Sequence, residues 1–211
     1  MPLIHNRELR KDSKIGIWEV TESESELSEL YPASDAELEK LQTFSHSFRR
    51  TQYLASRLLL HTLLPGSKII YDENGKPFPA DSTMHISISH SGNYIAIMTD
   101  CNYCGIDIET IHPKIEKIAG KFLSGEEIKT ISNNPSILRL HIYWCVKEAI
   151  YKVEGRKNIS LKSDIFVEEV SDSVSGSVRA TIKHDGTSTS RIVNYEQFEN
   201  CMLAWTEQTE I

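Results

Sequence analysis

The stretch His85–Glu109, HISISHSGNYIAIMTDCNYCGIDIE, decides the fold that we expect for this chain. His85–His90 alternates isoleucine with polar residues, Tyr94–Thr99 is rich in isoleucine, and a Ser-Gly turn separates the two runs. Side chains of a strand alternate between its faces, so the pattern predicts a β-hairpin. Gly105–Glu109 alternates in the same way and predicts a further short strand.

A long helix is expected on each side of this hairpin. Phe44–Leu64 has helical periodicity and stops at a Pro-Gly pair, and Leu138–Gly155 carries an apolar stripe at helical spacing. From Ile159 to Trp205 the sequence alternates and is rich in Ser, Thr and Val, as β-hairpins are. Helix followed by strands thus occurs twice. We expect an α+β fold of two pseudo-symmetric α/β lobes, residues 1–102 and 103–211, with the active site in the cleft between them.

Shorter elements complete this expectation. Ile15–Val20 alternates and predicts a strand. Ser34–Leu41 and Ser124–Ile131 each open with a serine that has a glutamate three residues later, which is a helix-start signal. Glu22–Leu30 is acidic and is compatible with a helix or a loop.

Composition limits the class of protein. The 211 residues allow one large domain or two small ones, and the formal net charge of −7 argues against a general nucleic-acid binder. Four cysteines are too few for a disulfide framework. Asn6–Lys14 is too polar for a signal peptide, and no apolar run approaches the ~20 residues of a membrane span. We expect a cytoplasmic protein with no membrane segment.

Two carboxylates fall at alternate positions of the Gly105–Glu109 strand. Asp107 and Glu109 would share a face, with Cα atoms roughly 6–7 Å apart. Carboxylates held this close repel unless a cation lies between them, and oxygen ligands suit Mg²⁺. The alternative is a strand whose outer face is solvated.

The second long helix places Trp144, Glu148 and Lys152 at positions i, i+4 and i+8. Glu148 is a candidate third metal ligand or general base, and Lys152 is a candidate for neutralising a phosphate. The alternative is an exposed Glu–Lys pair worth a few tenths of a kcal/mol.

Basic and polar residues of the first half suit an anionic ligand. Arg50 and Arg57 lie near one face of the first long helix and have the planar fork that grips phosphate, although a solvated helix flank is equally compatible. Lys76 lies in an Asn-Gly-Lys-Pro turn. Ser89 and His90 end a strand beside a turn whose N–H groups can hold an anion, and the alternative is a pair that caps the turn. A Ser-His nucleophile would be expected in a G-x-S-x-G sequence, which is absent here.

Taken in order, these motifs resemble those of the 4′-phosphopantetheinyl transferase superfamily, in particular its larger single-chain type with two pseudo-repeated lobes. The motifs are N-G-K-P (74–77), I-S-x-S-H-S-G (86–92), G-I-D-I-E (105–109), F-L-S-x-x-E (122–127) and W-x-x-K-E-A-x-x-K-x-x-G (144–155). The resemblance covers about Arg49 to Gly155, roughly half the chain.

The resemblance implies an Mg²⁺-dependent transferase of the holo-[acyl-carrier-protein] synthase type, with Mn²⁺ as a possible substitute. Such an enzyme moves 4′-phosphopantetheine from coenzyme A (CoA) to a serine of an acyl or peptidyl carrier protein and releases adenosine 3′,5′-bisphosphate. The carrier could serve fatty acid, polyketide or nonribosomal peptide biosynthesis. A monomer is expected, because one chain would supply both lobes.

The resemblance also implies roles for individual residues. Asp107, Glu109 and Glu148 would bind the metal, Glu148 would also be the base for the serine, and Lys152 would lie on the pyrophosphate. The nucleotide end of CoA would meet five residues of the first half: Lys76, Ser89, His90, Arg50 and Arg57. Phe122–Ile131 would lie near the carrier-docking surface.

One stretch departs from the family pattern. Ser34–Ser47 has only Lys40 and His46 where family members often carry further basic residues, so the 3′-phosphate would be held differently. Two alternatives remain: a Mg²⁺-dependent phosphohydrolase acting on CoA-like substrates, and a non-catalytic CoA-binding regulator. The combination of Glu148 and Lys152 argues against the regulator, which needs neither a base nor a leaving-group cation.

Overall fold

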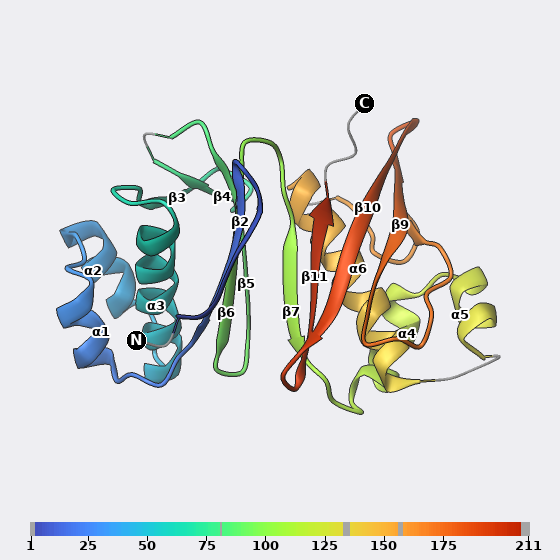
Figure 1. Cartoon of the computed structure of the whole chain (residues 1–211), viewed down its shortest axis with the longest axis horizontal. Helices are drawn as coiled ribbons and strands as arrows, with labels where there is room; N and C mark the ends of the chain where they lie inside the picture. The colour runs from blue at the N-terminus through green and yellow to red at the C-terminus, as the bar shows by residue number, and fades with distance from the viewer. Residues whose placement is uncertain (1–2, 81, 133–135, 156–157, 208–211) are drawn as a thin grey trace. The chain divides into compact units, whose positions relative to one another are not determined.

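The structure, a computed structural model, describes residues 3–80, 82–132, 136–155 and 158–207. The chain divides into two compact units: unit 1 comprises Met1–Asp72 and Pro77–Asn102, and unit 2 comprises Glu73–Lys76 and Tyr103–Ile211. Both units contain helices and strands (Figure 1), which confirms the expected α+β class. Glu73–Lys76 groups with unit 2 although it lies among the first 102 residues.

Unit 1 consists of an antiparallel sheet, a small hairpin and three helices. The sheet has the strand order β1-β2-β6-β5, and β3 pairs with β4. Helix α3 packs against β2 and β6, and α1 packs against α3, so the core lies between α3 and the sheet. The bounds are β1 Leu3–Arg10, β2 Ser13–Glu19, α1 Glu24–Leu30, α2 Asp35–Gln42, α3 Ser47–Leu63, β3 Ile69–Tyr71, β4 Pro77–Pro79, β5 His85–Ser91 and β6 Tyr94–Asp100.

Unit 2 places one long helix across a five-stranded antiparallel sheet of order β7-β11-β10-β9-β8 (Figure 1). Helix α6 packs against all five strands, and its expected apolar stripe is buried, which confirms that prediction. The bounds are β7 Ile106–Thr110, α4 Ile115–Phe122, α5 Gly125–Ser132, α6 Ile137–Glu154, β8 Ile165–Val167, β9 Ser175–His184, β10 Thr187–Phe198 and β11 Cys201–Glu207.

The helix ends follow from local side-chain chemistry. Ser34 and Glu37 form a capping box at the start of α2, in which Glu37 Oε2 accepts from the backbone N–H of Ser34 at 2.9 Å. Ser124 Oγ accepts from the N–H of Glu127 at 3.3 Å, so the expected start of α5 is also confirmed. Helix α6 ends at Gly155, whose φ of +64° is a left-handed conformation that glycine adopts without a Cβ clash.

Some elements settle an open alternative or were not expected from the sequence. Within the acidic stretch Glu22–Leu30, residues Glu24–Leu30 form a helix, α1. Strands β1, β3 and β4 and helix α4 were not expected from the sequence. Strand β1 is an edge strand rich in polar residues, β3 and β4 have three residues each, and α4 contains Gly120, a poor helix former. In the part of the chain that the structure describes, every helix is too short or too polar to cross a membrane.

Candidate functional site

The carboxylate of Asp107 is held inside unit 2. Asp107 is 3% exposed on β7, and Glu109 is partly buried two positions further along the same strand. The alternating geometry of a strand directs both side chains to one face, as the sequence predicted. A freely solvated outer face is therefore the wrong interpretation of this strand.

Helix α6 brings Glu148 and Lys152 to these carboxylates. Lys152 Nζ donates to Asp107 Oδ1 at 2.7 Å and to the carbonyl of Ile106 at 3.0 Å. Burial, together with the negative charges of Asp107 and Glu109, raises the pKa of Glu148 to about 7, although the Lys152 ammonium acts in the opposite direction. Lys152 thus pairs with Asp107, and the interpretation of Glu148 and Lys152 as an exposed surface pair is wrong.

A glycine allows this close approach of helix and strand. A Cβ on Gly105 would lie 1.9 Å from the carbonyl oxygen of Ala149, a backbone atom in the middle of α6. Gly105 is also held to β11, because its N–H donates to Thr206 Oγ1 at 2.9 Å. Since Glu148 precedes Ala149 directly and Lys152 follows it by three residues, this contact sets how near both side chains come to β7.

The donor set fits a hard divalent cation. Asp107, Glu109 and Glu148 offer only oxygen ligands, which Mg²⁺ prefers. Burial, followed by repulsion from Asp107 and Glu109, raises the pKa of Glu148 to about 7, and a divalent cation would favour its ionised form. Among the described residues no three His, Cys, Asp or Glu side chains stand close enough together to hold a metal ion. Mg²⁺ commonly takes one or two protein carboxylates and completes its shell with water and substrate phosphate, so the residues present remain suitable.

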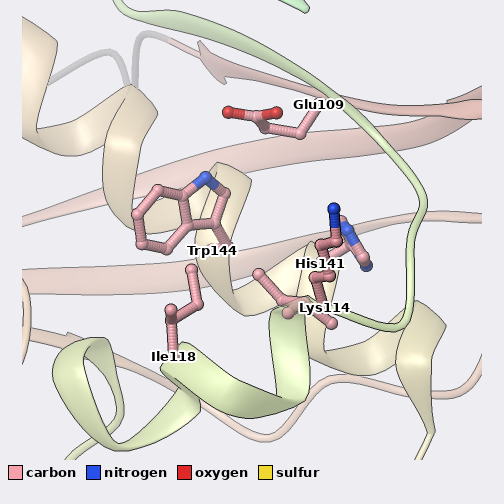
Figure 2. Close-up of a pocket in the computed structure, with 6 residues that line it drawn as sticks. Glu109, Lys114, Ile118, His141 and Trp144 are labelled. Carbon is pink, nitrogen blue, oxygen red and sulfur yellow. The ribbon is translucent and has the colours of Figure 1, made fainter.

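A pocket of about 190 Å³ opens beside Glu109 (Figure 2). Figure 2 shows the Glu109 carboxylate and the Ile118 side chain at opposite ends of the lining group, with Trp144 between them. The lining residues are Glu109, Lys114, Ile115, Ile118, His141 and Trp144. The pocket therefore combines apolar walls with one carboxylate and one ammonium group.

His141 is a neutral, oriented wall of this pocket. It is 3% exposed, and burial lowers the pKa of its imidazole. The N–H of His112 donates to its Nε2 at 3.3 Å, and Nδ1 lies 2.9 Å from the carbonyl oxygen of Ile137. Both ring nitrogens thus lie against backbone groups, which fix the orientation of the imidazole. The sequence pattern did not single out His141, although it precedes Trp144 by three residues on the same helix.

The phosphate-binding residues expected in unit 1 have different surroundings. Arg49 Nη1 lies 3.2 Å from His90 Nε2, and both side chains are exposed. Arg50 instead donates to Glu24 at 2.7 Å and to the carbonyl of Phe44 at 3.0 Å. Ser89 is 7% exposed. The structure therefore joins His90 to Arg49, the neighbour of the Arg50 that the resemblance implies for the nucleotide end of CoA.

Arg57 is built into the interior of unit 1. It is 3% exposed, its Nε lies 3.3 Å from Glu37 Oε1, and its guanidinium stacks on Tyr53 with 3.2 Å to the ring centroid. Although burial opposes the ionisation of Glu37, hydrogen bonds from Ser34 and Tyr31 and the charge of Arg57 keep its pKa below 4.5. A ligand would have to displace these partners to reach Arg57.

Lys76 contacts the end of α6 within unit 2. Its Nζ donates to the carbonyl of Val153 at 2.5 Å and lies 4.6 Å from the centroid of the Tyr103 ring. A cation at a helix C-terminus satisfies carbonyls that have no partner within the helix. Lys76 therefore stabilises the end of the helix that carries Glu148 and Lys152.

Comparison with known proteins relates the chain to one family. Residues 103–204 match the family model described as the 4′-phosphopantetheinyl transferase superfamily. A 4′-phosphopantetheinyl transferase of Bacillus subtilis is 31% identical over 178 residues, which are 79% of this chain and 78% of the relative. The 4′-phosphopantetheinyl transferase AcpT of Escherichia coli is 38% identical over 116 residues, 51% of this chain.

The extent of these matches differs. The aligned part covers 59% of the Escherichia coli protein and 58% of 4′-phosphopantetheinyl transferase psf-1 of Bacillus pumilus, which is 31% identical over 149 residues, 66% of this chain. The chain thus spans less than two thirds of the length of these two relatives. The matched region 103–204 contains Asp107, Glu109, Glu148 and Lys152.

Proposed function

This chain belongs to the 4′-phosphopantetheinyl transferase superfamily, and we propose that it transfers the 4′-phosphopantetheine group of CoA to a serine of an acyl or peptidyl carrier protein. One observation carries the proposal: Glu148 lies near Asp107, Glu109 and Lys152, and its pKa is raised to about 7. A general base works best when its pKa lies near the working pH.

In the proposed reaction the serine oxygen attacks the β-phosphorus of CoA, and the bond to adenosine 3′,5′-bisphosphate breaks. Glu148 accepts the proton of the serine hydroxyl, directly or through a water molecule. Lys152 neutralises charge on the pyrophosphate near the leaving group. The pair of Lys152 with Asp107 keeps the ammonium group at the site, since the salt bridge limits the rotamers of both side chains.

Asp107, Glu109 and Glu148 would hold Mg²⁺ or Mn²⁺, and the bound cation would supply charge neutralisation at the pyrophosphate. The pocket beside Glu109 suits the pantetheine arm, which has apolar segments and stays bonded to the phosphorus under attack. Ile115, Ile118 and Trp144 supply apolar contact area there. The neutral tautomer of His141 can face an amide of the arm without burying a charge.

For the nucleotide end of CoA we propose Arg49 and His90 as the principal anion-binding pair, because both are exposed and lie 3.2 Å apart. Ser89, Lys76 and Arg50 stay predictions for this end. Arg57 is better assigned to holding α3 against α2, since its guanidinium is buried on Glu37 and Tyr53. The monomeric state, and the arrangement of two pseudo-symmetric lobes with the active site between them, stay predictions from the family resemblance.

The test is intact-mass spectrometry of apo carrier proteins incubated with the chain, CoA and Mg²⁺. The wild type should add one phosphopantetheine mass, and Asp107→Asn should add none. Asp185→Asn is a matched control that should keep full activity, because Asp185 is 79% exposed and its φ of +49° suits asparagine. If the chain binds CoA but modifies none of the carriers, the proposed transferase activity is overturned. Cleavage of CoA under those conditions would indicate a hydrolase.

A further inference from the structure

A buried ion pair connects two helices of unit 2 beside the site. Lys147 on α6 is 0% exposed and Glu127 on α5 is 5% exposed, and Lys147 Nζ lies 2.7 Å from Glu127 Oε2. Lysine is almost never fully buried, and apolar side chains of similar volume often stabilise a core as well as a buried ion pair does. Core stability alone therefore does not account for this pair.

The ammonium group of Lys147 forms hydrogen bonds with three segments of the chain. Its Nζ donates to the carbonyls of Phe122 at 2.9 Å, Leu161 at 2.9 Å and Ile165 at 2.7 Å. Phe122 is the last residue of α4, and Ile165 is the first residue of β8. A cation at the end of α4 satisfies a carbonyl that has no partner within that helix.

The carboxylate of Glu127 completes the connection. Its Oε2 accepts from the N–H of Ser124 at 2.7 Å, and its Oε1 accepts from the N–H of Val167 at 2.9 Å. Ser124 precedes α5, and Val167 is the last residue of β8. The pair thus lies between the end of α4 and the start of α5 and ties both to α6.

These contacts determine where α4 stands against the reactive helix. The ring of Phe122 packs edge-on against Trp144 of α6, with centroids 5.1 Å apart and an interplanar angle of 76°, while the carbonyl of Phe122 accepts from Lys147. Helix α4 also supplies Ile115 and Ile118 to the pocket shown in Figure 2. Glu148 is the residue that follows Lys147, so the spacing between the α4 wall and Glu148 depends on this anchor.

We propose that Lys147 and Glu127 are positioning residues that hold α4 and α5 at the distance from α6 at which a carrier docked on Phe122–Ile131 presents its serine to Glu148. The inference rests on the proposed function. Neither residue touches CoA or the carrier. Both act through the placement of α4 and α5.

The experiment compares three variants of the full chain. Lys147→Met removes the cation and leaves the charge of Glu127 buried. The double variant Lys147→Met with Glu127→Gln removes both charges and keeps an oxygen for the N–H of Val167. Lys162→Met is the matched control, because Lys162 also donates to a carbonyl of α4, that of Gly120 at 2.8 Å, but is exposed.

We expect Lys147→Met to melt at a lower temperature than the wild type and the double variant to recover much of that loss. The kcat/KM of the double variant for the carrier should still be about ten- to a hundredfold below wild type, because small misplacements of reacting groups cost this much. Its dissociation constant for CoA should stay within about twofold, and its amide hydrogen exchange should accelerate in α4 and α5 but not in β10. Lys162→Met should match the wild type in all four measurements.

If the double variant regains both the melting temperature and the kcat/KM of the wild type, the ion pair only stabilises the fold and the proposal is overturned. Unchanged exchange in α4 and α5 would overturn it as well, and this readout needs no enzymatic activity. If the wild type modifies no carrier, the proposed function fails while the exchange data still decide whether the pair positions the two helices. If the double variant does not fold, Glu127→Gln alone, which keeps Lys147 on its three carbonyls, is measured in the same way.

Discussion

At Glu148, burial and the charges of two nearby carboxylates oppose ionisation more than one ammonium group favours it, and the pKa rises from 4.5 to about 7. A carboxylate with this pKa is half protonated near neutral pH and can both accept and return a proton. The same imbalance would be relieved by a divalent cation, which favours the ionised form. The electrostatics of one side chain thus fits both roles proposed for it.

A pH dependence of stability follows from this shift. Because the folded-state pKa of Glu148 is raised, the folded chain holds a proton that the unfolded chain releases at about pH 4.5. The contribution of Glu148 to the free energy of unfolding is fully present below pH 4.5 and is lost as the pH rises through about 7. The free energy of unfolding of the wild type, measured by urea titration in EDTA, should therefore fall relative to that of Glu148→Gln between pH 4.5 and 7.

Mg²⁺ is the control for this prediction. Added Mg²⁺ should flatten the wild-type curve and leave Glu148→Gln almost unaffected, because the cation stabilises the ionised carboxylate of the folded state. Parallel curves for the two proteins in EDTA would show that the pKa of Glu148 does not change on folding.

Two arginines of α3 show why residue type alone does not identify a ligand contact. Arg49 is exposed beside His90, whereas Arg57 is enclosed by Glu37 and Tyr53. Helical periodicity placed Arg57 near a candidate anion-binding face, but its surroundings depend on α2, which folds back from elsewhere in the sequence. Burial and a hydrogen bond to Glu37 also raise the pKa of Tyr31 to about 12, as expected in a closed interior network.

At the scale of elements, the decisive contact is that of α6 with the start of β7. The helix must approach the strand closely for Lys152 Nζ to reach Asp107 Oδ1 at 2.7 Å. Only the missing side chain of Gly105 allows this, since the opposing atom belongs to the backbone of Ala149 and cannot rotate away. A residue with no functional group thereby controls the geometry of those that have one.

Gly105→Ala should therefore destabilise the folded chain by about 3 kcal/mol, as overpacking against a rigid neighbour does. Transfer activity should fall at temperatures where the variant is still folded, because α6 has to move away from β7. Gly120→Ala is the matched control: a Cβ there meets nothing within 4 Å, and alanine should stabilise α4 by up to about 1 kcal/mol. Thermal and urea denaturation of both variants measures the difference, and equal stabilities would contradict the contact.

At the scale of the whole molecule, the net charge of −7 bears on carrier recognition. An acidic carrier would be repelled by such a chain unless docking relies on a local surface. The proposed docking segment Phe122–Ile131 contains Ile128, which is 39% exposed, and its exposed charges, Glu126 and Lys129, are of opposite sign, while Glu127 is buried on Lys147. Contact there would depend on apolar area more than on charge.

The KM for the carrier should accordingly change by less than about threefold when NaCl is raised from about 0.05 to about 0.3 M, a range over which screening of exposed charges becomes strong. The dissociation constant for CoA, a multiply charged ligand, should rise over the same range and serves as the internal control. A steep, continuous rise of the carrier KM with salt would mean that exposed charges drive docking.

The sequence by itself determined the α+β class, the apolar stripe of α6, the starts of α2 and α5, and the alternation of Asp107 with Glu109, because each depends on neighbours within a few residues. Strands β1, β3 and β4 and helix α4 were missed, since an edge strand, strands of three residues and a short helix with an internal glycine carry a weak local pattern. Only the tertiary structure decided that Lys152 pairs with Asp107, that Arg57 is enclosed, and that Lys147 and Glu127 connect α4, α5 and α6. These partners are 20 to 45 residues apart in the chain. Their proximity is created by packing, which no local pattern of residues encodes.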